Sequence, residues 1–166
     1  RMHNTTPEDI HVPTGGFNTN IDYCVRVFVH KLTKSDGTMG VSDAYIASQI
    51  NYLNAQFGGG FNFLWDETIN TIANTSIYNT NIEVDDLGNG SYDFSVLADY
   101  NSNEGLDIYF SDRNFGAAGV ANGIADHSQI VMGPISDGGN SPAGLIHEVG
   151  HAFGLFHTFH STFGNG

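Results

Sequence analysis

The chain has 166 residues, of which 40% are hydrophobic and 14% are charged, and 18 Asp and Glu against 5 Lys and Arg give a formal net charge of -13. This length and apolar content predict one globular domain with its own core rather than a disordered chain. The negative charge disfavours binding to nucleic acid and to anionic lipid, since both are driven by basic side chains near phosphates, and no run approaches the roughly 20 apolar residues of a membrane span.

Residues 1–22 are rich in Pro, Gly, Asn and Thr without periodicity, which predicts an irregular lead-in. They lack the basic-then-apolar pattern of a signal peptide, but the high Asn and Gly contents and few Lys are typical of exported proteins, so we expect a secreted, extracellular protein. Residues 23–30 are apolar at nearly every position and predict a strand covered on both faces. Cys24 in this run is the one cysteine, so it is either a buried thiol or bridged to chain outside this sequence, and the apolar surroundings favour the buried thiol.

A helix is predicted from Ser42 to Phe57, where apolar residues recur at spacings typical of one buried stripe. Ser42 or Asp43 caps its start, and the glycines at 58–60 end it. Residues 61–65 form the next apolar run. A strand, a helix and a second strand in succession predict a mostly parallel sheet.

The middle of the chain is less regular. Residues 68–78 are compatible with an extension of the second strand, and residues 85–90 form a loop. Its Asp and Asn side chains are of the types that bind calcium, but the complete spacing of a calcium-binding loop is absent, so a solvated turn is favoured. Further strands are predicted at 106–110 and 128–132, separated by a small-residue segment, 116–123, that is suited to lie flat beside a ligand.

A helix predicted from Ser141-Pro142 to about Phe153 carries the chemistry, with Gly154 supplying the left-handed turn that ends it. At about 100° per residue, His147 and His151 fall about 40° apart with Glu148 beside them, so all three face one way. The opposite arc is apolar and is expected to face the sheet; it comprises Leu145, Val149, Ala152 and Phe153.

Two imidazoles one helical turn apart can bind one zinc ion at Zn–N distances of about 2.0–2.1 Å. Because Gly154 turns the chain back, His157 is placed to be the third ligand, which leaves the fourth position open. Glu148 is then the expected general base in an attack of zinc-activated water on a peptide carbonyl. Two histidines and a glutamate are also compatible with a plain polar helix surface, but the full pattern over residues 147–157 favours Zn2+.

The other histidines lack ligand spacing and are expected to be structural or solvated; they are His3, His11, His30 (at a strand end), His127 and His160. His160 follows the motif closely and is the candidate for orienting a ligand. Trp65 is interpreted as a core residue or a covered surface aromatic.

The string from 147 to 157, followed by Thr158-Phe159, resembles the extended zinc signature of the metzincin metalloproteases, in the pappalysin or cytophagalysin branch. Residues 49–54 and 106–110 are similar to a helix and a strand of that branch. The resemblance implies an α/β (α+β) fold with a twisted five-stranded sheet, four strands parallel and an antiparallel edge strand around 118–123, a backing helix and an active-site helix. It also implies a protein or peptide substrate bound along that edge by strand addition.

Metzincins carry a methionine turn after the third histidine, whereas Met2, Met39 and Met132 all precede the motif. We therefore expect residues 23–166 to be the N-terminal subdomain of a catalytic domain through the zinc motif, without its C-terminal subdomain. Two functions remain open: a zinc endopeptidase, and a catalytically incompetent zinc-binding or substrate-binding fragment of one. The sequence carries no signal for an oligomeric state.

Overall fold

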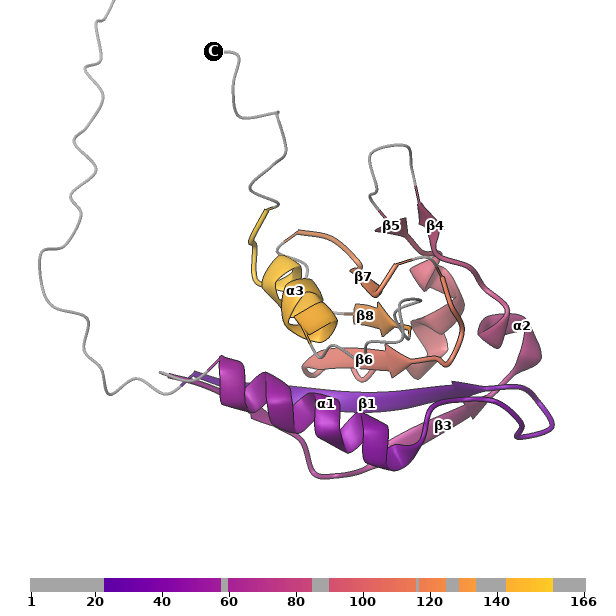
Figure 1. The fold of residues 1–166 in the computed structure, drawn as a ribbon, viewed down its shortest axis with the longest axis horizontal. Coiled ribbons are helices and arrows are strands. Elements are labelled where there is room, and N and C mark those ends of the chain that lie inside the picture. The colour runs from indigo at the N-terminus through magenta and orange to yellow at the C-terminus, as the bar shows by residue number, and fades with distance from the viewer. Residues whose placement is uncertain are drawn as a thin grey trace, which may run out of the picture.

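Strand β1 (Tyr23–Thr33) runs through the middle of a mostly parallel sheet in the computed structural model (Figure 1). The structure describes residues 23–57, 60–84, 90–115, 117–124, 129–133 and 143–156. None of the helices in these ranges is long and apolar enough to cross a membrane. The mixed α/β class and the mostly parallel sheet predicted from the sequence are confirmed.

The strands lie in the order β2-β1-β6-β8-β7, and β3 also pairs with β1. All these pairings are parallel except that of β7 with β8, which is antiparallel and places β7 at one edge. A separate hairpin pairs β4 with β5. The bounds are β2 (Phe61–Leu64), β3 (Ile69–Ala73), β4 (Glu83–Val84), β5 (Gly90–Ser91), β6 (Leu106–Phe110), β7 (Gly119–Ala121) and β8 (Gln129–Met132).

The main sheet has six strands rather than the five predicted, because β2 and β3 follow one another along the same side of β1. Residues 68–78 do not extend β2 but form β3 and the short helix α2 (Thr75–Tyr78). The chain leaves the sheet between β2 and β3 in a turn where Glu67 has a positive φ of 65° and Asp66 Oδ1 accepts the N–H of Thr68 at 2.9 Å. An aspartate that bonds to the backbone two residues on is a typical turn former.

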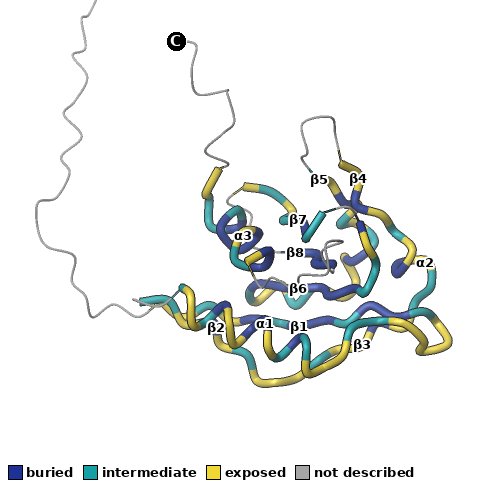
Figure 2. Tube along the Cα trace, in the orientation of Figure 1, coloured by how far each residue is buried: buried dark blue, intermediate teal, exposed yellow. Residues whose placement is uncertain are grey.

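One face of the sheet is covered by α1 (Asp43–Gln56) and α3 (Ala143–Ala152). The oxygen of Ser42 accepts the N–H of Tyr45, which makes Ser42 the cap of α1. The predicted stripe of α1 is buried at Ile46, Ile50 and Leu53, and Phe57 packs against it. These side chains form one core with alternate residues of β1, β6 and β8. Figure 2 shows buried residues where the helices meet the sheet.

The other face of the sheet is covered by α2 and the 3-10 helix η1 (Phe94–Tyr100). Their apolar side chains form a second core with the remaining alternate residues of β1, β6 and β8, among them Leu32, Tyr109 and Val131. Strand β6 is therefore buried at every position. Its alternating sequence predicted a strand but did not predict that both of its faces are covered.

His30 lies inside β1 and not at a strand end, as the sequence had suggested. Its Nε2 is 2.7 Å from Asp107 Oδ1, both side chains are buried, and the His30 ring stacks on Tyr109 with centroids 4.4 Å apart. The backbone N–H and the hydroxyl of Ser102 also donate to the Asp107 carboxylate. Of the two roles expected for His30, structural or solvated, the structure shows the structural one, because a buried carboxylate such as that of Asp107 requires a partner of this kind.

Cys24 is exposed, so the prediction of a buried thiol is wrong. Strand β1 is buried on both faces only in its second half, because α2 and η1 cover the far face there and not beside Cys24 and Arg26. Tyr23 at the start of the strand is also 55% exposed. An apolar run thus identified the strand but not how much of it is covered.

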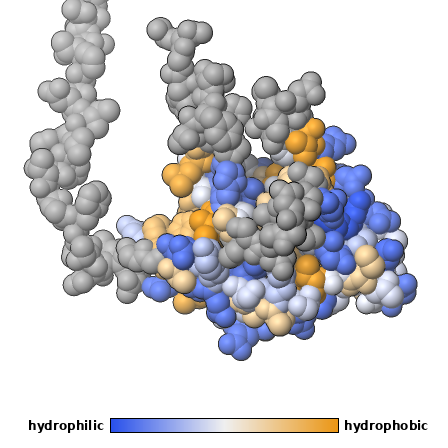
Figure 3. All heavy atoms as spheres, in the orientation of Figure 1, coloured by the Kyte–Doolittle hydropathy of each residue, from blue (hydrophilic) through white to orange (hydrophobic). Residues whose placement is uncertain are grey.

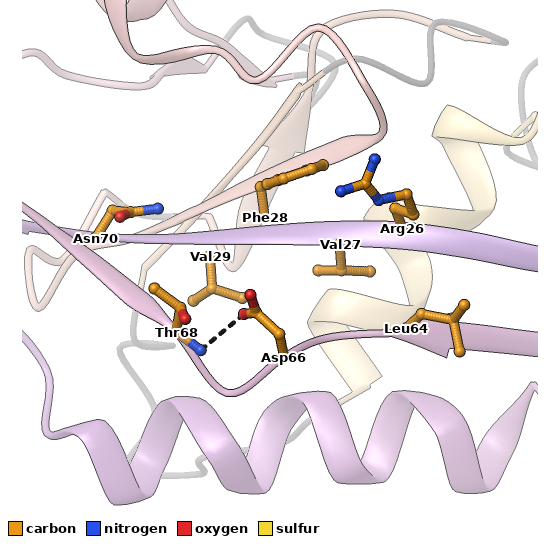
Figure 4. A pocket seen from close by; sticks show the side chains of 8 residues that line it. All are labelled: Arg26, Val27, Phe28, Val29, Leu64, Asp66, Thr68 and Asn70. Atoms are coloured by element: carbon orange, nitrogen blue, oxygen red, sulfur yellow. Dashed lines mark hydrogen bonds between the residues drawn. The ribbon is translucent and has the colours of Figure 1, made fainter.

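A cavity of about 260 Å³ opens at the break between β2 and β3 (Figure 4). It is lined by residues 26–29 of β1 together with Leu64, Asp66, Thr68 and Asn70. No residue of α3 lines it, so it is separate from the predicted metal ligands.

Candidate metal centre

Helix α3 ends in the turn that the sequence predicted. Gly154 has a φ of 95°, its N–H donates to the carbonyl of His151, and the N–H of Leu155 donates to the carbonyl of Gly150, each at 2.9 Å. These two bonds and the left-handed residue define a Schellman motif, in which glycine is favoured because it has no Cβ to clash with the backbone. The predicted cap at Ser141-Pro142 lies outside the described residues. Where α3 ends, Leu155 and Phe156 are exposed, and hydrophobic side chains gather there in Figure 3.

His147 and His151 converge on one side of α3. Their Nε2 atoms are 2.9 Å apart, and their rings are nearly perpendicular, with centroids separated by 4.4 Å. Two ligand nitrogens at about 2.05 Å from a tetrahedral zinc ion are about 3.3 Å apart, so a shift of a few tenths of an ångström suits these two nitrogens to one ion. Imidazole is also a ligand type that zinc prefers.

The carbonyl of Leu155 determines which ring nitrogen of His151 carries the proton. This oxygen lies 2.6 Å from Nδ1 of His151. Because a carbonyl only accepts, Nδ1 carries the proton, and the neutral ring then presents an unprotonated Nε2 toward His147. A ligating histidine commonly donates its other N–H in this way, which fixes both the tautomer and the ring orientation. The turn at Gly154 places the Leu155 carbonyl beside His151, so the end of the helix and the orientation of the His151 ring have one cause.

Glu148 is buried, with 7% of its surface exposed, because its side chain lies between α3 and β7. Figure 1 shows α3 beside β7 and β8. Burial raises the pKa of the Glu148 carboxyl, while nearby His151 and the backbone N–H of Ala121 act in the opposite direction. The sequence predicted that Glu148 faces the same way as the two histidines; in the structure Glu148 is buried, whereas His147 is exposed.

The apolar arc of α3 is confirmed. Leu145, Val149 and Ala152 are fully buried, and Phe153 is partly buried against the rings of Phe61 and Phe63. This contact fixes the rotation of the helix about its axis. The rotation in turn determines the side of the helix on which His147 and His151 lie.

The structure brings together two of the three predicted ligands and the predicted base. The third ligand, His157, lies outside the described residues, as do Thr158-Phe159 and the loop at 85–89. Also outside them are His3, His11, His127 and His160. Within the described ranges, no group of three or more His, Cys, Asp or Glu side chains is arranged to hold a metal ion.

Neither a search against models of protein families nor a search of curated proteins found a match to this chain. The function of the centre is therefore inferred from its own residues.

Sequence reasoning missed three backbone features of the centre: the carbonyl of Leu155, the N–H of Ala121, and the space left by Gly119. Backbone groups leave no residue-type signal. The one available hint was the small-residue segment 116–123, which was expected to lie flat beside a ligand; Gly119 of this segment lies beside Glu148.

Proposed function

We propose that this chain is a zinc-dependent endopeptidase of the metzincin type, with His147, His151 and His157 as ligands and Glu148 as general base. The observation that carries the proposal is the convergence of two Nε2 atoms, 2.9 Å apart, beside a buried carboxylate on the same helix. The signature resemblance over residues 147–157 supports His157 as the third ligand. A structural zinc site usually closes its fourth position with protein and gains nothing from a base, which favours the enzyme.

Zinc, when bound by these residues, would supply a Lewis acid that polarises a peptide carbonyl and lowers the pKa of water towards about 7. Glu148 would take the proton of the attacking water and pass it to the leaving amine. Its burial supports this role, because a carboxyl whose pKa is raised towards neutral is a better proton acceptor and donor in turn. The substrate would be an extended peptide, added as a strand to the edge at β7.

The first test is zinc content together with hydrolysis of a fluorogenic peptide library by the full chain. We expect the wild type to bind about one zinc ion per chain and to cleave peptides. Glu148→Gln keeps the shape of the side chain but removes the base, so it is expected to retain zinc and lose about 10²- to 10⁴-fold in turnover. His151→Ala is expected to lose zinc as well.

The outcomes separate the functions. If the wild type and Glu148→Gln both bind zinc and neither hydrolyses peptides, the result would support a catalytically incompetent zinc-binding fragment instead. If the wild type does not bind zinc, and His151→Ala does not change the content of any metal, both the endopeptidase and the zinc-binding fragment are refuted. The proposal includes a secreted, extracellular localisation. We therefore expect the protein to be active when it is expressed in a host that secretes it.

A further inference from the structure

Strand β2 is the last strand on one side of the sheet, and some of its backbone groups point away from β1. The N–H of Tyr23 in β1 donates to the carbonyl of Gly60 at 2.6 Å, so Gly60 faces β1. Because the direction alternates along a strand, Phe61 and Phe63 turn their N–H and C=O groups outward. Among the strands that the structure describes, none pairs with this outer edge.

A side chain of α1 occupies this edge in place of a strand. Oδ1 of Asn54 accepts the N–H of Phe63 at 2.8 Å, and Nδ2 of Asn54 donates to the carbonyl of Phe63 at 3.0 Å. Both ends of the amide are used, and these two bonds fix its orientation, since an N–H only donates and a carbonyl only accepts. A residue opposite Phe63 in an antiparallel strand would make the same two bonds. Helix α1 lies beside β2, which brings the Asn54 side chain within reach (Figure 2).

The edge that Asn54 covers has the composition of a strand that self-associates. Residues 61–65 are Phe-Asn-Phe-Leu-Trp, without charge or proline, and aromatic residues favour strands. Leu64 is 51% exposed, so apolar surface beside the edge faces solvent. An open edge with these properties pairs readily with another chain, and proteins commonly block such edges. Of the outward residues of β2, Phe61 and Phe63, Asn54 occupies both backbone groups of the second.

We propose that Asn54 keeps the outer edge of β2 closed against pairing with a second copy of this chain. Two identical edges fit each other, because antiparallel pairing about a twofold axis places the same strand on both sides. A second copy is also the strand that is present wherever this chain is concentrated. To pair, each copy must first break the two bonds between Asn54 and Phe63, and this cost keeps the copies apart. The proposal is independent of the metal centre and goes beyond the proposed function.

Asn54→Ala tests the closure, with Asn51→Ala as the matched control. Asn51 lies about one turn earlier on α1 and is exposed, so alanine there changes the same helix without opening the edge. In sedimentation velocity over a range of concentrations, Asn54→Ala is expected to dimerise with an association constant at least about tenfold above those of the wild type and of Asn51→Ala, since the two bonds no longer have to be broken. Equal association of the three proteins would overturn the proposal.

A lysine on the strand distinguishes pairing at this edge from association through unfolded protein. Leu64→Lys adds a charge beside the edge, and lysines on edge strands disfavour pairing. In combination with Asn54→Ala, it should restore the association constant of the wild type. Aggregates larger than a dimer, or a dimer that Leu64→Lys leaves unchanged, would contradict the proposal, because the chains would then meet elsewhere.

Hydrogen exchange tests the same bond without an association step. The Phe63 amide of the wild type is expected to exchange slowly, although it lies on an outer edge, because Asn54 accepts its proton. At low protein concentration, this amide should exchange at least about tenfold faster in Asn54→Ala but not in Asn51→Ala. Rapid exchange in the wild type would refute the closure, even if Asn54→Ala did not fold. Neither assay uses zinc or turnover, so their outcome is independent of the proposed endopeptidase.

Discussion

The glycines at 150 and 154 lie within one turn of each other, and we expect alanine to have opposite effects at the two positions. Gly150 is inside α3, and a Cβ there would meet only the Leu155 side chain, at 3.4 and 3.9 Å, which is ordinary contact. Replacing it by alanine should stabilise the helix by about 0.5–1 kcal/mol, because glycine loses more backbone entropy on folding. Gly154 has a φ of 95°, where alanine costs about 1–2 kcal/mol.

The two variants should therefore differ by about 2 kcal/mol in the free energy of unfolding, or about 4–8 °C in melting temperature for a domain of this size. Thermal and urea denaturation of the metal-free proteins would measure the difference, so that zinc does not contribute to stability. Equal melting temperatures, or a less stable Gly150→Ala, would refute the reasoning from backbone conformation.

The same pair of variants also tests how His151, a proposed zinc ligand, is oriented. Gly154→Ala should disturb the turn that brings the Leu155 carbonyl to Nδ1 of His151, and loss of such a partner typically lowers metal affinity about 10- to 100-fold. Gly150→Ala leaves this bond intact. Competition with a zinc chelator would measure both affinities, and an unchanged affinity in Gly154→Ala would show that the Leu155 carbonyl does not orient the ligand.

Three further predictions concern the sheet and its second core. Asp107→Ala should lower the free energy of unfolding by about 3 kcal/mol in urea denaturation, because it leaves His30 buried without its partner; a loss below about 1 kcal/mol would contradict this. Leu97→Ala should cost about 2–5 kcal/mol by the same assay, since Leu97 is fully buried, and a neutral result would mean that the second core is loosely packed. Burial, together with the hydrogen bond to Asp112, raises the pKa of Tyr78 to about 12, from about 10 in the unfolded chain. This contribution to stability is complete below about pH 10 and is lost as the pH rises towards 12, so the stability of the wild type relative to Tyr78→Phe should fall over that range, and a constant difference would disprove it.

The sequence by itself determined the elements whose causes are local. The stripe of α1 and its Ser42 cap are recognisable because residues three and four apart share a helix face and a serine oxygen reaches the third N–H after it. The end of α3 was predictable for a similar reason, because the left-handed turn at Gly154 involves only a few neighbouring residues. The convergence of His147 and His151 also follows from the geometry of one helical turn.

Only the tertiary structure decided what depends on residues far apart in the chain. Cys24 is exposed because α2 and η1 cover another part of the sheet, and His30 is held by Asp107, 77 positions away. Glu148 is buried because β7, a strand of small residues, lies against α3. Residue spacing along a helix fixes the direction in which a side chain leaves it, but burial and hydrogen bonding depend on which distant strand packs there, and that is set by the packing of the whole sheet.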